Sequence, residues 1–106
     1  MSEIRQALEQ AIEDNKICLF VKGTKEMPRC GFSASVIEIF KQLDVPFTCV
    51  DILADPRLRP ELVSISQWPT TPQIFLNGEF IGGGDIIREM FANGELRPMV
   101  EQALAS

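Results

Sequence analysis

A short loop sequence, Met27-Pro28-Arg29-Cys30-Gly31-Phe32-Ser33, stands between an apolar run at residues 17–21 and a segment whose apolar residues recur at helical spacing. A strand, a tight loop and a helix in that order would place Cys30 at the N-terminal end of the helix. The first-turn N–H groups and the helix dipole favour a thiolate over a thiol there. Nearby cations act in the same direction: Lys22, Lys25 and Arg29. The sequence therefore predicts that Cys30 is a reactive nucleophile.

The other two cysteines have different surroundings. Cys18 lies inside the apolar run and Cys49 inside a second predicted strand at residues 47–52, so both are predicted to fill the core. Cys30 could be a third buried cysteine, but its Pro, Arg and Gly neighbours are typical of a loop. Ser33 stands where a second thiol would let Cys30 resolve its own mixed disulfides. An external thiol must then resolve any mixed disulfide at Cys30.

Composition limits the classes of function. The chain has 106 residues, a net charge of −5 and no histidine. This length predicts one domain, and the excess of acidic residues argues against a surface that binds nucleic acid. The lack of histidine excludes histidine metal ligands and histidine general bases. Three cysteines without C-x-x-C spacing argue against a disulfide framework or a four-cysteine zinc site, and they indicate a reducing compartment, which we expect to be the cytoplasm. No signal core and no membrane-spanning run is found, although a presequence removed earlier remains an alternative.

Periodicity predicts helices and strands along the rest of the chain. We expect an amphipathic helix capped by Ser2 and ending near residue 14, and a strand at 47–52 parallel to the first. A third helix should begin at Asp55-Pro56, with Asp55 as its N-cap, or at Pro60. Strands at 73–76 and 79–81 should form a hairpin around Asn77-Gly78. Two final helices should follow, one opening at Asp85 and one over residues 96–104, which together predict a small mixed sheet with helices on both faces.

A glycine-rich turn precedes the fourth of these helices. Residues 82–84 are all glycine and lead into Asp85. Free N–H groups at a helix N-terminus can bind a carboxylate or a phosphate. The same glycines could simply make a turn, so the pattern alone does not distinguish a binding site from a structural loop.

Four motifs in order resemble one family, the monothiol glutaredoxins of the Cys-Gly-Phe-Ser class. The matching segments are Lys22-Gly23-Thr24, Cys30-Gly31-Phe32-Ser33, Trp68-Pro69-Thr70-Thr71-Pro72-Gln73, and Gly82-Gly83 followed by Asp85. The resemblance covers almost the whole chain. It implies a single glutaredoxin domain over residues 1–106 with a thioredoxin-like α/β fold, a four-stranded mixed sheet flanked by helices, an extra N-terminal helix and a cis Thr71–Pro72 bond.

The resemblance also implies a glutathione site. Lys22 and Arg59 would hold the glycine carboxylate of glutathione, the Thr71 backbone would pair with its cysteinyl unit, and Gly84 and Asp85 would take its γ-glutamyl end. Two cations, a helix N-terminus and one acid are complementary to the two carboxylates and one ammonium of glutathione. The implied contact set is completed by Phe32 and Pro72.

Iron–sulfur chemistry is the main function that the resemblance implies. Two protomers would share one [2Fe–2S] cluster, each supplying the Cys30 thiolate and one bound glutathione thiolate, in a homodimer that exists when the cluster is bound. The implied partners are BolA-like proteins and the proteins that donate or accept clusters. One alternative is a weak glutathione-dependent oxidoreductase that removes glutathione from protein mixed disulfides through Cys30. Another is a regulatory module that senses iron.

Overall fold

The computed structural model describes residues 2–106, so Met1 of the predicted domain lies outside the described residues. The helices and strands follow the predicted order. Their bounds are α1 Glu3–Asp14, β1 Ile17–Val21, α2 Gly31–Leu43, β2 Thr48–Asp51, α3 Leu58–Ser66, β3 Gln73–Leu76, β4 Glu79–Gly83, α4 Gly84–Ala92 and α5 Leu96–Ala105. None of the helices in this part of the chain is both long and apolar enough to cross a bilayer.

The four strands form one mixed sheet in the order β2-β1-β3-β4. Strand β1 runs parallel to β2, with Leu19 opposite Cys49, and antiparallel to β3, with Cys18 opposite Phe75. Strands β3 and β4 form the predicted antiparallel hairpin, in which Asn77 and Gly78 have φ values of 55° and 85°. Two positive φ values in succession match the type I′ turn that two-residue hairpins favour. The predicted thioredoxin-like fold is confirmed.

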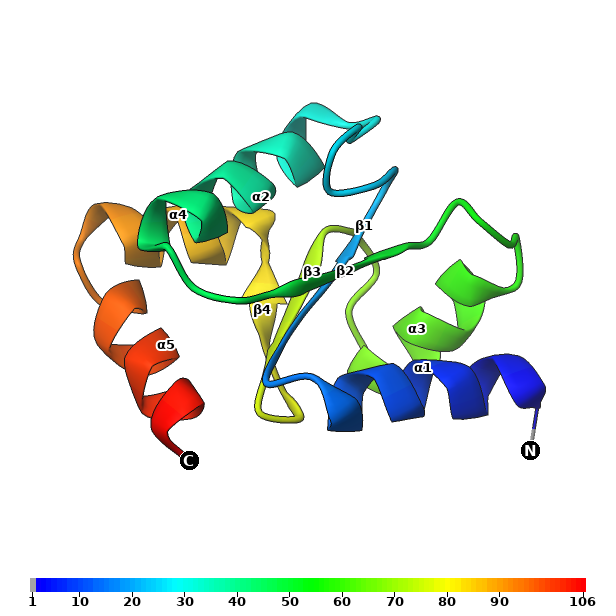
Figure 1. Ribbon diagram of the computed structural model, residues 1–106. Coiled ribbons are helices and arrows are strands. Elements are labelled where there is room, and N and C mark those ends of the chain that lie inside the picture. The colour runs from blue at the N-terminus through cyan, green and yellow to red at the C-terminus, as the bar shows by residue number, and fades with distance from the viewer. Residues whose placement is uncertain (1) are drawn as a thin grey trace.

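The central strand β1 supplies both hydrophobic cores, because successive side chains of a strand point to opposite faces. Its odd-numbered residues pack with α2, α4 and α5, and its even-numbered residues pack with α1 and α3. Figure 1 shows α1 and α3 on one side of the sheet and α2 and α4 on the other. All five residues of β1 are buried, as the apolar run predicts for a strand covered on both faces.

Helix α1 is the predicted N-terminal extension. The Ser2 hydroxyl accepts a hydrogen bond from the Arg5 N–H at 3.1 Å, which confirms Ser2 as its N-cap. Leu8 and Ile12 form its buried face, and the helix packs beside α3. Its position explains the amphipathic pattern, since one face covers the sheet and the other meets solvent.

The start of α3 differs from both predictions, because the helix begins at Leu58 with Arg57 as its N-cap. The Asp55 carboxylate accepts a hydrogen bond from the Arg57 N–H at 2.9 Å, closing a turn before the helix instead of capping it. Pro60 is the third helical residue. The N–H groups of the first helical turn have no partner within the helix, so the proline removes no helical hydrogen bond there.

Strand β4 continues beyond its predicted end at Ile81. Gly82 pairs with Ile74 and Gly83 with Gln73, so these two glycines complete the ladder to β3. Helix α4 then begins at Gly84, one residue before the predicted start. Helix α4 therefore follows β4 without a connecting loop, and its first turn lies beside the first turn of α2.

Candidate functional site

Cys30 is the N-cap residue of α2, as predicted, and its side chain is half-buried. The loop before it folds back on β1: the Arg29 N–H donates to the Lys22 carbonyl at 2.8 Å, and Gly23 pairs with Pro28. The Cys30 carbonyl accepts the Ala34 N–H at 2.9 Å, which begins the helix. The thiol is thus fixed between the end of β1 and the first turn of α2.

The surroundings of Cys30 favour its thiolate. The backbone N–H of Ser33 does most to hold the pKa of Cys30 below its ordinary value, partial burial opposes this, and the Phe32 N–H, the Ser33 hydroxyl and the Lys22 charge add to the lowering. Sγ does not complete a capping hydrogen bond to the first turn in the structure. We therefore attribute the lowered pKa to donors that face the sulfur and attract it once it is charged.

Lys22 supports the thiolate, whereas Lys25 is directed elsewhere. The Lys22 charge lowers the Cys30 pKa, but the Lys25 ammonium donates to the Phe47 carbonyl at 2.7 Å and lies 4.1 Å from the Phe47 ring centroid. The Lys25 ammonium is directed away from Cys30 because it is held by Phe47, the residue that precedes β2. The closeness of Lys25 to Cys30 in the sequence does not indicate which way the Lys25 side chain points.

Ser33 has a structural role that its place in the motif did not predict. Its side chain is fully buried, and its hydroxyl accepts the Lys22 N–H at 3.1 Å. This bond ties the first turn of α2 to the end of β1. Ser33 therefore helps to position Cys30 while offering no second thiol.

The remaining cysteines are unsuited to thiolate chemistry. Cys18 is completely buried, and desolvation followed by repulsion from Cys49 raises its pKa to about 12. Burial also raises the pKa of Cys49 to about 11, although Lys25 acts in the opposite direction. Cys49 is half-buried and packs against the core between the sheet and α2. The prediction of a core position is confirmed for Cys18, whereas Cys49 lies at the margin of the core on the edge strand β2.

A cleft of about 250 Å³ opens beside the first turns of α2 and α4. It is lined by Phe32, Thr70, Thr71, Pro72, Gly84 and Asp85, and the Thr71–Pro72 bond is cis, as the resemblance predicts. Five of the seven residues predicted to bind glutathione line this cleft. Two segments far apart in sequence, the Phe32 turn and the residues from 70 to 85, are therefore brought together.

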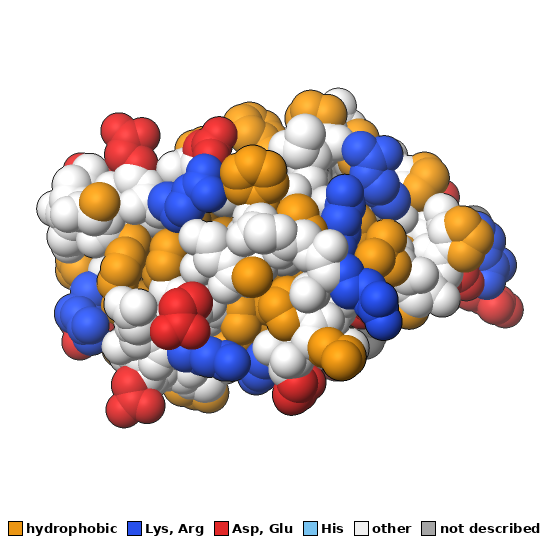
Figure 2. Space-filling model, turned by 90° about the horizontal axis from the view of Figure 1, so that it is seen from above, with side chains coloured by type: hydrophobic (Ala, Val, Ile, Leu, Met, Phe, Trp, Pro, Cys, Tyr) orange, Lys and Arg blue, Asp and Glu red, His pale blue; other side chains and the backbone are white. Residues whose placement is uncertain are grey.

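Lys22 and Arg59, the other two predicted residues, do not line the cleft. Lys22 lies at the end of β1 near Cys30. The Arg59 Nη2 donates to the Pro69 carbonyl at 3.0 Å, which places its guanidinium against the loop that precedes Thr70. Figure 2 looks onto the face above α2 and shows lysine and arginine side chains gathered in a band beside exposed hydrophobic ones.

Gln73 holds the loop that forms one wall of the cleft, and it was not identified as a site residue from the sequence. Its side chain is fully buried, and its Nε2 donates to the carbonyls of Trp68 and Thr70, both at 3.0 Å. These bonds hold the loop that carries Thr70 and Thr71. The signal in the sequence was a polar residue at the start of an otherwise apolar strand.

Arg88 is a second residue that sequence reasoning missed. Its guanidinium Cζ lies 5.2 Å from the Phe32 ring centroid, and its Nη2 donates to Asp85 Oδ1. Both contacts are with residues that line the cleft. The available signal was its place three residues after Asp85 on a predicted helix, which puts both side chains on one face.

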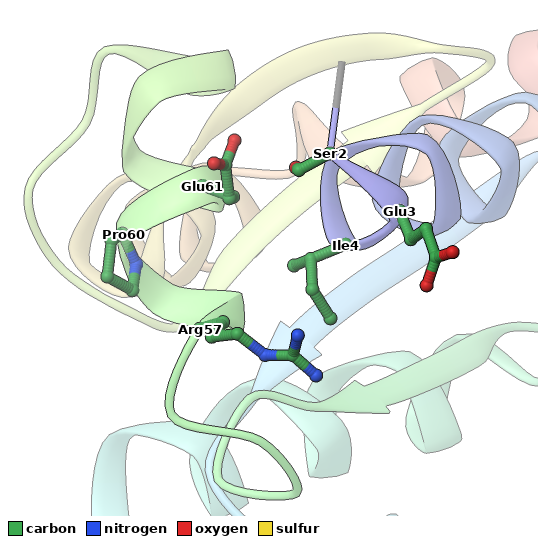
Figure 3. A pocket seen from close by; sticks show the side chains of 6 residues that line it. All are labelled: Ser2, Glu3, Ile4, Arg57, Pro60 and Glu61. Carbon is green, nitrogen blue, oxygen red and sulfur yellow. The ribbon is translucent and has the colours of Figure 1, made fainter.

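A larger cavity, about 450 Å³, lies away from this site between the N-terminal parts of α1 and α3 (Figure 3). None of the predicted site residues lines it. Its wall consists of Ser2, Glu3, Ile4, Arg57, Pro60 and Glu61. It contains no cysteine, so size alone does not identify the reactive site.

Alkylation should distinguish the three thiols. The thiolate is the reactive form, and the lowered Cys30 pKa keeps it populated as the pH falls below the ordinary cysteine value of about 8.5. Site-resolved mass spectrometry with iodoacetamide between pH 5 and 9 should give a Cys30 midpoint below that value, with Cys18 and Cys49 protected in the folded chain. Lys22→Gln should raise the midpoint and Lys16→Gln should not. A wild-type midpoint at 8.5 or above would contradict this assignment.

Comparison with known proteins gives consistent matches. The family model "Glutaredoxin" matches residues 17–81, which include Cys30 and Thr71. The chain is 48% identical to a ycf64-like monothiol glutaredoxin of Synechocystis, over 98% of this chain and 97% of that one. The solution structure of reduced poplar apo GrxS14 is 45% identical with a TM-score of 0.86, over 97% of this chain and 94% of that one. The fold is also shared by the crystal structure of a buckwheat glutaredoxin–glutathione complex, which is 24% identical with a TM-score of 0.83. The match covers 94% of this chain and 89% of the buckwheat chain.

Proposed function

This chain belongs to the monothiol glutaredoxins, and from that premise we propose that it binds glutathione beside Cys30 and carries a [2Fe–2S] cluster between two copies of itself. Its role would be the assembly and transfer of iron–sulfur clusters and iron homeostasis. One observation carries the proposal: the accessible cysteine with a lowered pKa lies beside a cleft whose walls suit a zwitterionic peptide.

The proposed glutathione pose follows from charge and shape. The γ-glutamyl end would lie at Gly84 and Asp85, where the first turn of α4 supplies N–H groups and the Asp85 carboxylate faces the ammonium. The cysteinyl unit would pair with the Thr71 backbone next to Pro72, with Phe32 on the other side of the cleft. Lys22 and Arg59 would reach the glycine carboxylate by side-chain movement from outside the cleft. In the buckwheat protein of the same fold, a glutathione complex has been solved.

The supply of thiolates supports a shared cluster. A [2Fe–2S] cluster needs four ligands. Within residues 2–106 no group of three or more His, Cys, Asp or Glu side chains is placed to hold a metal, and only Cys30 combines accessibility with a lowered pKa. One chain then supplies one thiolate. A second copy and two glutathione molecules would supply the remaining three, and the exchangeable glutathiones suit a cargo that must be released.

The proposed partners follow from the same site. The cluster-bound form would be a homodimer, and a BolA-like protein or a cluster donor or acceptor would bind at the face that carries Cys30. Three free cysteines suit a reducing compartment such as the cytoplasm.

A second candidate function rests on the lowered pKa of Cys30. The Cys30 thiolate would attack the glutathione sulfur of a protein mixed disulfide, forming a Cys30–glutathione disulfide and releasing the protein thiolate. A second glutathione would then attack the glutathione sulfur of that disulfide, giving glutathione disulfide and the free Cys30 thiolate. The net reaction consumes one glutathione thiol and replaces the protein–glutathione disulfide by glutathione disulfide, so it needs no other oxidant or reductant. No second thiol on this chain is required.

Anaerobic reconstitution with iron, sulfide and glutathione tests the two functions. The cluster proposal expects visible sulfide-to-iron charge-transfer bands that require glutathione, on a species that elutes as a dimer in size-exclusion chromatography. A colourless monomer would reject it. Turnover of a glutathionylated protein by that same colourless preparation would support the oxidoreductase instead.

A further inference from the structure

Arg88 bridges the two helices that flank the cleft, although it does not line the cleft itself. Its guanidinium lies over the ring of Phe32 in the first turn of α2 and donates to the Asp85 carboxylate in the first turn of α4. Contact with an aromatic face and a carboxylate at once fixes the plane and the position of the guanidinium. Arg88 is therefore held at the rim of the cleft beside Asp85.

The guanidinium retains donors for a further partner. Arginine has five N–H donors in a planar fork. Among the residues that the structure describes, the Asp85 carboxylate is the only acceptor that hydrogen-bonds to the Arg88 side chain, through Nη2. The Arg88 side chain is 36% exposed and that of Asp85 is 90% exposed. Both charged groups can therefore meet a ligand that enters the cleft from solvent.

An adjacent guanidinium and carboxylate are complementary to the amino-acid end of a γ-glutamyl peptide. That end carries an ammonium and an α-carboxylate on the same carbon atom. Asp85 can accept hydrogen bonds from the ammonium while the Arg88 fork donates to the carboxylate. The protein and the ligand each present one positive and one negative group. Each charged group of the ligand can therefore face a group of opposite charge on the protein.

We propose that Arg88 is a specificity-determining residue that binds the γ-glutamyl α-carboxylate of glutathione and selects ligands with a zwitterionic amino-acid end. This inference rests on the proposed function, because it assigns Arg88 to the glutathione site. The opposing possibility is that Arg88 only neutralises Asp85, in which case it competes with the ammonium of the ligand. The two possibilities differ in sign, since removing Arg88 weakens binding in the first and strengthens it in the second.

The test measures dissociation constants by isothermal titration calorimetry for two tripeptides. One is glutathione, and the other is 4-aminobutyryl-cysteinyl-glycine, which keeps the ammonium and lacks the α-carboxylate. Arg88→Gln should weaken glutathione binding about fivefold, the range of a partly exposed charge pair. It should leave the affinity for the second peptide nearly unchanged. Arg88→Lys should recover part of the loss, because it keeps the charge and lacks the fork.

Two further variants separate the possible failures. Arg97→Gln removes the same charge from an exposed position on α5 and should not change either affinity. Lys22→Ala should weaken both peptides, because both keep the glycine carboxylate. Unchanged or stronger glutathione binding by Arg88→Gln, or equal weakening for both peptides, would overturn the role of Arg88 alone. Failure of the wild-type chain to bind glutathione would overturn the proposed function and this inference together.

Discussion

Replacing Cys30 by serine should abolish both glutathione-dependent cluster assembly and any turnover of glutathionylated substrates. Cys30 is the only one of the three cysteines whose pKa is lowered, and a hydroxyl at the same position is neither a thiolate ligand nor a disulfide partner. The visible bands after anaerobic reconstitution should disappear and the eluted species should be a monomer. The midpoint of urea unfolding should change little, because the side chain is half-buried at a helix N-cap where serine is itself favourable.

Two matched variants control for loss of a cysteine as such. Cys49→Ser should keep the cluster bands. Cys18→Ser should also keep them but should destabilise the fold by about 1–3 kcal/mol, since it places a hydroxyl at a fully buried position between the sheet and the layer of α1 and α3. Retention of the bands by Cys30→Ser, or their loss in Cys49→Ser, would show that the cluster is held elsewhere.

Gly23→Ala should destabilise the protein strongly and disorganise the loop that precedes Cys30. Gly23 has a φ of +94°, and a Cβ atom there would lie 2.6 Å from the Met27 carbonyl oxygen and 2.7 Å from the Arg29 backbone nitrogen. Both obstacles are backbone atoms, so the loop itself must move. The left-handed conformation costs roughly 1–2 kcal/mol, and the steric conflict adds to it. We expect a total loss of about 3 kcal/mol in urea unfolding.

Gly31→Ala is the matched control for that change. Gly31 is the first residue of α2, and apart from its chain neighbours and the adjacent helix backbone no atom lies within 4 Å of a Cβ built on it. Alanine has a better helix propensity than glycine, so this variant should be neutral or slightly more stable. The Cys30 alkylation midpoint should rise in Gly23→Ala and stay constant in Gly31→Ala. Equal stability of the two variants would show that the loop tolerates a side chain at residue 23.

The sequence predicted the layered fold because its signals were local. The apolar run of β1, the Asn77-Gly78 turn and the helical periodicities each depend on neighbours in the chain, and all of these elements are present. The start of α3 was mispredicted because Asp55 has two competing local uses. Its carboxylate bonds to Arg57 just two residues later, and the helix starts beyond that turn.

The site was only partly predictable because its geometry depends on contacts between distant segments. Gln73 was missed because its two acceptor carbonyls belong to a loop whose path no local pattern specifies. The contact of Arg88 with Phe32 joins residues on different helices. The resemblance to monothiol glutaredoxins predicted that Lys22 and Arg59 bind glutathione. In the structure, neither residue is part of the cleft wall. Long flexible side chains leave no periodic signal in a sequence.

The buried hydroxyl of Ser33 has a consequence for the evolutionary history of this site. A return to two-thiol chemistry would require cysteine at position 33, one nucleotide change away for several serine codons. Sulfur is a poor hydrogen-bond acceptor, so that change would leave the Lys22 N–H without its strong partner in a place closed to water. Ser33→Cys is therefore expected to lower the stability of the fold, and a chain that regains a second thiol must offset that loss elsewhere. With serine at this position, the resolution of a mixed disulfide at Cys30 depends on an external thiol.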